Sequence, residues 1–312
     1  DKMMASLSGS SSTQHPLPII LIRGFGGLTT ADEQKIAYQG FNEGSVYPQK
    51  RGENYIYEGM LLRFLKSDWK YRDATNVIGF YSTDLTAPSV IPAEFKALDP
   101  AYFSGRILLD PAIALQLLRS NDDPRQTLWV FRYYDLNDRT FSYYGKALVR
   151  LIECIRALIA LKLGDSKPKV NIIAHSMGGL ILREAIQNTY PSQAKQADEA
   201  INKVVTLGTP HKGISFQVLR DLRWLGIEAA SELEQFNPEN QKSLSNQTGW
   251  GNFHNYFPME RILAVVGTNY RTYNIQAASV LNRLFSVEGE YGANYNRSDG
   301  LVKQDSAQID GA

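Results

Sequence analysis

The strongest signal of architecture in this chain is the decapeptide Val170-Asn171-Ile172-Ile173-Ala174-His175-Ser176-Met177-Gly178-Gly179. It opens with an apolar run typical of a buried strand, and the residues after it have the apolar spacing of a helix. A serine at a sharp turn between a strand and a helix, with small residues two places before and after it, is the pattern of a nucleophile elbow. Here the small residues are Ala174 and Gly178. We therefore predict that Ser176 is the attacking oxygen of an enzyme, and a serine that only caps the helix is the alternative.

Apolar strands and amphipathic helices alternate on both sides of this elbow. Strands are predicted at residues 18–22, 127–134, 170–174, 203–207 and 261–266. Helices are predicted at residues 146–163 and 179–188, where apolar side chains recur at helical spacing. Because buried strands that alternate with helices pair in parallel, the sequence predicts an α/β fold with a mostly parallel sheet and helices on both faces.

Two stretches fit this alternation poorly, and we expect both to be insertions. They cover about residues 28–126 and 211–260, and loops of this length are usually functional or separately folded. The second holds an amphipathic segment at residues 216–227, followed by a polar and aromatic stretch at 237–257. It is either a mobile lid over an apolar cleft or a packed cap helix. As a lid, it would also allow contact with a membrane or lipid surface.

Composition and charge limit the kinds of protein that this chain can be. Its 312 residues are 43% hydrophobic, so we expect one large domain at residues 17–312 after a flexible segment at 1–16. The 33 Lys and Arg nearly balance the 32 Asp and Glu without long blocks of one sign, so no nucleic-acid partner is expected. Both ends of the chain look like cuts, and we expect the domain to be truncated at its C-terminus.

Cysteine usage and hydropathy give two further exclusions. Cys154 is the only cysteine, which excludes an internal disulfide, and it is expected to pack as a small apolar residue on its helix. No stretch approaches the roughly 20 apolar residues that cross a bilayer. Neither observation indicates a compartment.

The glycine-rich turn after the first predicted strand has a place in the same chemistry. In an elbow enzyme, the negative oxygen of the intermediate binds two backbone amides, one from the residue after the nucleophile and one from the loop after an earlier strand. We predict that Met177 and Phe25 donate these amides, because Phe25 lies in the segment Arg23-Gly24-Phe25-Gly26-Gly27. The alternative is a turn whose glycines serve only chain reversal.

A carboxylate is expected after the last predicted strand, because the chain order of this kind of triad is nucleophile, acid, histidine. Asp299 lies in that place and Asp305 is the weaker candidate. A plain turn made by Asp299 and Gly300 is the structural alternative.

No histidine follows where the base should be. The sequence contains four histidines, namely His15, His175, His211 and His254. The elbow turns the His175 side chain away from the serine oxygen, and His254, among aromatic residues, is the weak candidate for the base. We expect the base to have followed Ala312. The histidines show no metal-ligand spacing, so we expect neither a metal nor another cofactor.

Taken together, the motifs resemble those of lipases and esterases of the α/β-hydrolase fold, of the triacylglycerol-lipase and lecithin:cholesterol-acyltransferase-like kind, including inositol-deacylase-like proteins. Residues 18–27 are similar to the family's strand and H-G-F-G-G turn, with Arg23 in place of the usual histidine. Residues 174–179, 207–213 and 298–302 are similar to its A-H-S-M-G-G, G-T-P-H-x-G and N-D-G-L-V segments. The resemblance implies a serine hydrolase that cleaves carboxylic esters through an acyl-enzyme, with fatty-acyl or lipid substrates favoured.

Other functions fit the same motifs. An acyltransferase or a thioesterase differs only in the acceptor or the leaving group. A hydrolase-fold protein without catalytic activity, which binds an apolar ligand or a partner, would fit the missing histidine. A metal-dependent hydrolase has little support.

Overall fold

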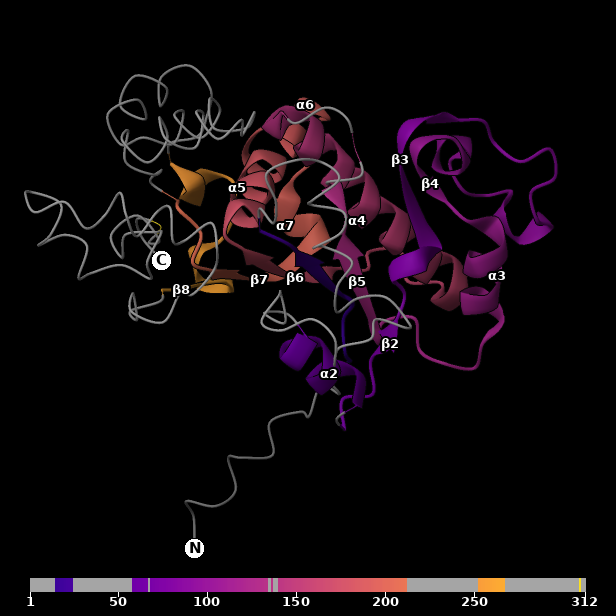
Figure 1. Ribbon diagram of the computed structural model, residues 1–312, viewed down its shortest axis with the longest axis horizontal. Helices are drawn as coiled ribbons and strands as arrows, with labels where there is room; N and C mark the ends of the chain where they lie inside the picture. The colour runs from indigo at the N-terminus through magenta and orange to yellow at the C-terminus, as the bar shows by residue number, and fades with distance from the viewer. Residues whose placement is uncertain are drawn as a thin grey trace, which may run out of the picture.

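The computed structural model describes residues 15–24, 58–66, 68–133, 136, 140–211, 252–266 and 309. Within them, six strands form one sheet in the order β2-β5-β1-β6-β7-β8, and each strand is parallel to its neighbours (Figure 1). The strands of this sheet are β1 (Ile19–Ile22), β2 (Arg72–Asp73), β5 (Thr127–Phe131), β6 (Val170–His175), β7 (Ile201–Leu207) and β8 (Ile262–Val265).

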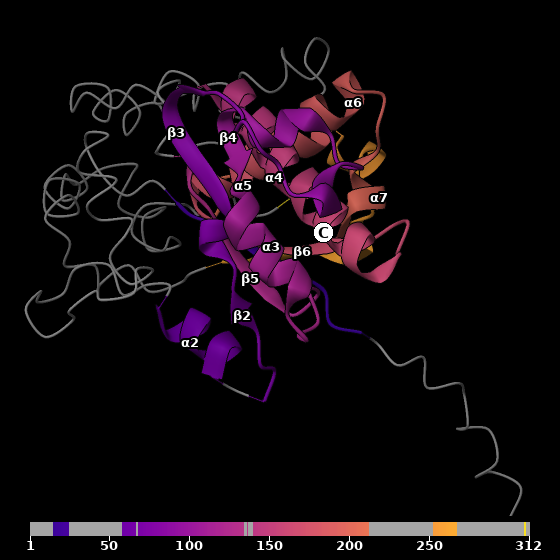
Figure 2. The same ribbon diagram turned by 90° about the vertical axis from the view of Figure 1, so that its right-hand side faces the viewer.

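The helices cover both faces of the sheet, as β1 at its centre shows. Alternate side chains of a strand point to opposite faces. Ile20 and Ile22 belong to the large core beneath α4 and α5, whereas Ile19 and Leu21 pack in a second core with α2. In both views α2 and α4 lie on opposite sides of the strands (Figures 1 and 2). The predicted α/β fold is therefore confirmed.

Six α-helices lie within the described residues. They are α2 (Glu58–Lys66), α3 (Pro111–Arg119), α4 (Phe141–Leu163), α5 (Met177–Glu184), α6 (Tyr190–Ser192) and α7 (Ala197–Ala200). None of the helices in these parts of the chain is both long enough and apolar enough to cross a membrane.

The long helix α4 starts five residues before the predicted start, because residues 140–143 supply a cap that the apolar spacing does not reveal. The Thr140 hydroxyl accepts a hydrogen bond from the Tyr143 amide at 3.2 Å, which satisfies one of the free donors of the first turn. Gly164 ends the helix with φ 69°, and its amide donates to the Ala160 carbonyl at 2.8 Å. Cys154 lies in the core on this helix, where burial raises the pKa of its thiol to about 12.

The described part of residues 28–126 is not a separate insertion, because it contributes a strand to the main sheet. It supplies the edge strand β2 and a second, antiparallel sheet made of β3 (Ile78–Leu85) and β4 (Gly105–Leu109). This second sheet is joined to α4, because the Arg150 guanidinium donates to the Ile107 carbonyl at 2.9 Å.

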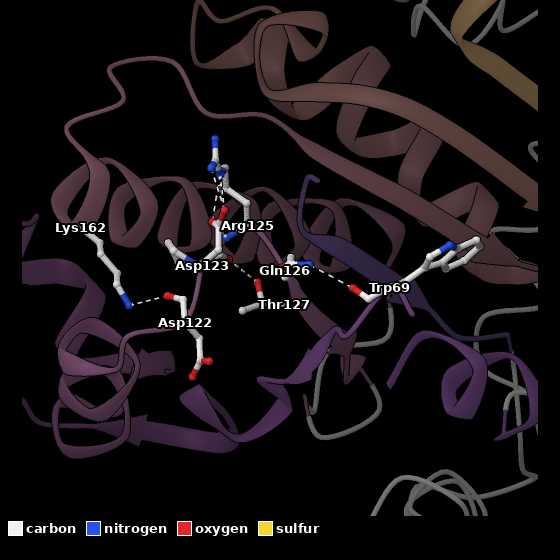
Figure 3. Close-up of polar contacts among 8 residues, drawn as sticks. Trp69, Asp122, Asp123, Arg125, Gln126, Thr127 and Lys162 are labelled. Carbon is white, nitrogen blue, oxygen red and sulfur yellow. Dashed lines mark hydrogen bonds and ion pairs between the residues drawn. The ribbon is translucent and has the colours of Figure 1, made fainter. Parts of the chain in front are cut away.

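The segment between α3 and β5 is held by polar contacts at the end of α4 (Figure 3). The Lys162 ammonium donates to the carbonyls of Leu117, Ser120 and Asp122 at 2.9, 2.7 and 2.8 Å. The Thr127 hydroxyl donates to the Pro124 carbonyl at 2.7 Å as the chain enters β5. A single charged side chain thus satisfies carbonyls that no helix or strand pairs.

Candidate active site

Ser176 occupies the turn between β6 and α5 in a backbone conformation that only glycine adopts easily. Its φ is 51° and its ψ is −126°. A non-glycine residue held in such a region costs about 1–3 kcal/mol, and this kind of strain gathers at functional sites. The turn is fixed at both ends, since the Ser176 amide donates to the Leu207 carbonyl at 2.9 Å and its carbonyl accepts from the Gly179 amide at 3.0 Å.

The two glycines after Ser176 are required by their neighbours. A methyl group at Gly178 would press against the carbonyl oxygens of Arg23 and Ile22, 2.7 Å from that of Ile22. A methyl group at Gly179 would overlap the side chain of Thr209, 2.8 Å from its Cβ. Helix α5 therefore starts in direct contact with the ends of both flanking strands, β1 and β7.

Gly24, the last described residue after β1, lies against the elbow. A methyl group built on Gly24 would be 3.0 Å from Cβ of Ser176 and 2.8 Å from Nδ1 of His175. Met177, the predicted donor on the other side, is the first residue of α5 and is buried. Phe25, the other predicted donor, lies outside the described residues, so its amide stays a prediction.

The imidazole of His175 packs against Gly24. Desolvation, with the buried Arg23 guanidinium as a second cause, lowers the pKa of His175 to about 4. The imidazole is therefore neutral at pH 7. Arg23, which replaces the family's usual histidine, thus places a buried positive charge beside the elbow.

His211 ends the described part of the turn after β7 and is buried within it. Its Nε2 lies 3.0 Å from the hydroxyl of Thr206, a hydrogen bond whose direction depends on the tautomer. Burial, with Arg183 as a second cause, holds the pKa of His211 well below its usual range. The neutral ring is committed to a contact inside the core, which fits a structural role.

The remaining predicted residues are not brought to Ser176 by the described structure. His254 lies exposed in the 3-10 helix η8 (Phe253–Asn255), and no hydrogen bond joins it to Ser176 in the described part of the chain. His15 precedes β1 and therefore lies near the amino ends of the parallel strands, whereas Ser176 follows the carboxyl end of β6. Asp299, Asp305 and residues 212–251, which include most of the expected lid or cap, lie outside the described residues.

One buried polar group near the site escaped the sequence reasoning. Arg183 follows three apolar residues in α5 and is buried with them. The sequence signal is a pair of charges, Arg183 and Glu184, directly after an apolar run, since charges buried in a helix need partners. The helix predicted at residues 179–188 also differs, because α5 ends at Glu184 and continues as a π-helical turn at Ala185–Thr189.

Comparison with known proteins places this geometry in a family. Residues 100–262, just over half of the chain, match the family described as "PGAP1-like alpha/beta domain". No curated protein matches the sequence.

Two solved structures illustrate the likeness. The mature Bacillus licheniformis lipase BlEst2 is 16% identical, with a TM-score of 0.42 over 96% of this chain and 83% of that one. A gene product of Listeria innocua is also 16% identical, with a TM-score of 0.37 over 94% of this chain and 77% of that one. Because the family match covers more than half of the chain and includes Ser176 and its elbow, the chain belongs to the family with a PGAP1-like α/β domain.

Proposed function

We propose that this protein is a lipase- or esterase-like hydrolase that cleaves carboxylic esters through an acyl-enzyme at Ser176. The observation that carries the proposal is the strained conformation of Ser176, with φ 51° and ψ −126° at the start of α5. A turn of this kind presents the serine oxygen beyond the carboxyl ends of the strands, where a base and backbone amides can reach it. A serine that only caps a helix needs extended backbone angles and no strain.

The proposed reaction uses Ser176 as the nucleophile. Its oxygen attacks the ester carbonyl while a histidine takes the hydroxyl proton, and the carbonyl π electrons move to oxygen. The amides of Met177 and Phe25 donate hydrogen bonds to that oxyanion. Collapse of the intermediate expels the alcohol, which receives the proton, and water then releases the acid by the same steps in reverse.

Asp299 has the role of the carboxylate that orients the histidine in this proposal. Among the histidines of the sequence, His175 and His211 have pKa values lowered by burial, and His211 is occupied by Thr206. His254 is the candidate that an experiment has to test. The proposed substrates are fatty-acyl or lipid esters, in keeping with the family resemblance.

Labelling with a fluorophosphonate probe tests the proposal. Ser176 displaces fluoride from the phosphorus atom, and the site is located by mass spectrometry of the peptides. We expect the label on Ser176 and no label after Ser176→Ala, whereas Ser192→Ala is the matched control because Ser192 donates to the Thr189 carbonyl at 2.7 Å away from the elbow. Hydrolysis of p-nitrophenyl esters of increasing chain length then gives the acyl preference.

Two results would contradict the assignment. A label on any residue other than Ser176 would remove the nucleophile. Full ester turnover that His254→Ala abolishes would make the exposed His254 the base, against the expectation that this substitution leaves the labelling rate unchanged.

A further inference from the structure

Arg183 is a charged side chain buried in the helix that starts at the proposed nucleophile. Only 6% of it is exposed, and its predecessors Leu180, Ile181 and Leu182 are at most 1% exposed. A charge buried among apolar side chains is costly unless it is paired and hydrogen-bonded. The role of Arg183 can therefore be inferred from the groups that its guanidinium contacts.

The Arg183 guanidinium joins three separate parts of the fold. Its Nη1 donates to the His211 carbonyl at 2.6 Å, and its Nε donates to Oε1 of Gln187 at 2.9 Å. The Phe253 ring of η8 lies over it, with 5.8 Å between Cζ and the ring centroid. The planar guanidinium thus holds α5, the turn after β7 and the segment before β8 in one arrangement.

The turn that Arg183 holds is the one on which the elbow rests. Ser176 donates its amide to Leu207, the last residue of β7, at 2.9 Å. Two residues later, Thr209 packs directly on Gly179 and is fully buried. A movement of residues 208–211 would therefore disturb both supports of the serine.

The π-helical turn brings the second acceptor into place. Gln187 lies in Ala185–Thr189, directly after α5, and is 2% exposed. Insertions of this kind inside helices occur often at functional sites. Burial and the nearby Arg183 lower the pKa of His211, so the imidazole next to the guanidinium is neutral and does not repel it.

We propose that Arg183 is a positioning residue, whose guanidinium fixes residues 208–211 against α5 and so holds Ser176 in its strained conformation. The inference rests on the proposed role of Ser176 as the nucleophile. Within the described part of the chain Arg183 makes no hydrogen bond to Ser176, and it acts through the elbow. A lysine has one nitrogen and cannot donate to His211 and Gln187 in the same planar arrangement.

The test compares Arg183→Lys with Arg156→Lys. Arg156 is a matched control because its Nε donates to the Pro168 carbonyl at 2.7 Å and its Nη1 donates to Glu153 at 2.8 Å, at the opposite end of β6. Saturating fluorophosphonate kinetics separate the maximal labelling rate of Ser176 from probe binding. Since a misplacement of about 1 Å can cost about 100-fold in rate, we expect Arg183→Lys to lower the maximal rate about 10- to 100-fold with little change in probe binding.

In Arg156→Lys, Ser176 should be labelled at the wild-type rate, even if this variant loses as much melting temperature as Arg183→Lys. Gln187→Met, which removes one acceptor and keeps the arginine, should give an intermediate rate and is the variant to use if Arg183→Lys does not fold. The proposal would be overturned if Arg183→Lys and Arg156→Lys had equal maximal rates. If Arg183→Lys does not fold, a Gln187→Met rate equal to that of the wild type would overturn it instead.

Hydrogen exchange separates this inference from the proposed function. We expect faster amide exchange in peptides that cover residues 176–184 and 206–211 of Arg183→Lys, or of Gln187→Met in its place, and not of Arg156→Lys. Unchanged exchange in both peptides would refute the positioning role. If wild-type Ser176 takes no label, the proposed function fails, and the exchange result alone decides whether Arg183 holds the turn.

Discussion

Replacing Ser176 by glycine should make the protein more stable while it removes the nucleophile. Ser176 holds φ 51° and ψ −126°, a region that glycine enters without steric cost because it has no Cβ. Ser176→Ala removes the same hydroxyl but keeps the Cβ, and with it the strain. The pair of variants therefore separates backbone strain from the loss of the oxygen.

The size of the effect follows from two opposing terms. Relief of the strained conformation gains about 1–3 kcal/mol. The extra freedom of glycine in the unfolded chain takes back about 0.5–1 kcal/mol. The central values of the two terms leave Ser176→Gly about 1 kcal/mol more stable than Ser176→Ala, within a range of about 0–2.5 kcal/mol.

Urea unfolding of both variants, followed by fluorescence, gives this difference from the midpoints at a common slope. Ser192→Gly and Ser192→Ala form the control pair, because Ser192 lies in helix α6, where glycine should be the less stable choice. A Ser176→Gly protein no more stable than Ser176→Ala would show that the turn stores no strain. The assignment of Ser176 as the nucleophile would then have no support from its backbone conformation.

Three further predictions concern the surroundings of the site. Gly178→Ala should lower the free energy of unfolding by about 1–3 kcal/mol and abolish labelling of Ser176, because the added methyl group meets the carbonyl oxygens of Ile22 and Arg23. Urea unfolding measures the first effect and the fluorophosphonate probe the second. A urea midpoint equal to that of the wild type would contradict this contact. The pKa of His175 is lowered from 6.5 to about 4, so between these pH values the unfolded state binds more protons and stability should fall as the pH falls from about 6.5 to 4, by at most about 3 kcal/mol. The difference between the pH profiles of the wild type and His175→Gln isolates this contribution, and parallel profiles would exclude it. Lys162→Met should cost about 1–3 kcal/mol, because it leaves the carbonyls of Ser120 and Asp122 without the ammonium donor, while the Leu117 carbonyl keeps the Ser120 hydroxyl at 3.0 Å. The exposed Lys66→Met should change the urea midpoint little, and equal midpoints for the two variants would count against this role of Lys162.

The parts of the fold that the sequence predicted are those whose signal is local. The apolar run 170–173 and the small residues at positions 174 and 178 identify a strand, a turn and a helix without knowledge of the rest of the chain. The central strands β1 and β5 were also predicted from apolar runs, because every residue in them is buried. Among the site residues, Ser176 was predicted from this pattern and its strained conformation supports the prediction.

The parts that could not be predicted depend on contacts between distant residues. The edge strand β2 has only two residues, and it forms because Arg72 and Asp73 meet Thr127 and Leu128 in β5. The role of Arg183 depends on His211, which lies 28 residues away along the chain. No local pattern encodes such pairs, because the partners meet only when the sheet has formed.

The central place of β1 in the sheet has a consequence for the order in which the molecule is made. Ile19 pairs with Leu128 of β5 and with Asn171 of β6, so both neighbours of the first strand are synthesised long after it. At about 5–20 residues per second, the ribosome needs roughly 8–30 s to extend the chain from β1 to β6. During that time an apolar strand waits without partners and is exposed to aggregation or to chaperones. Gly178 meets the carbonyls of Ile22 and Arg23 only after this pairing, so the elbow is completed late in folding.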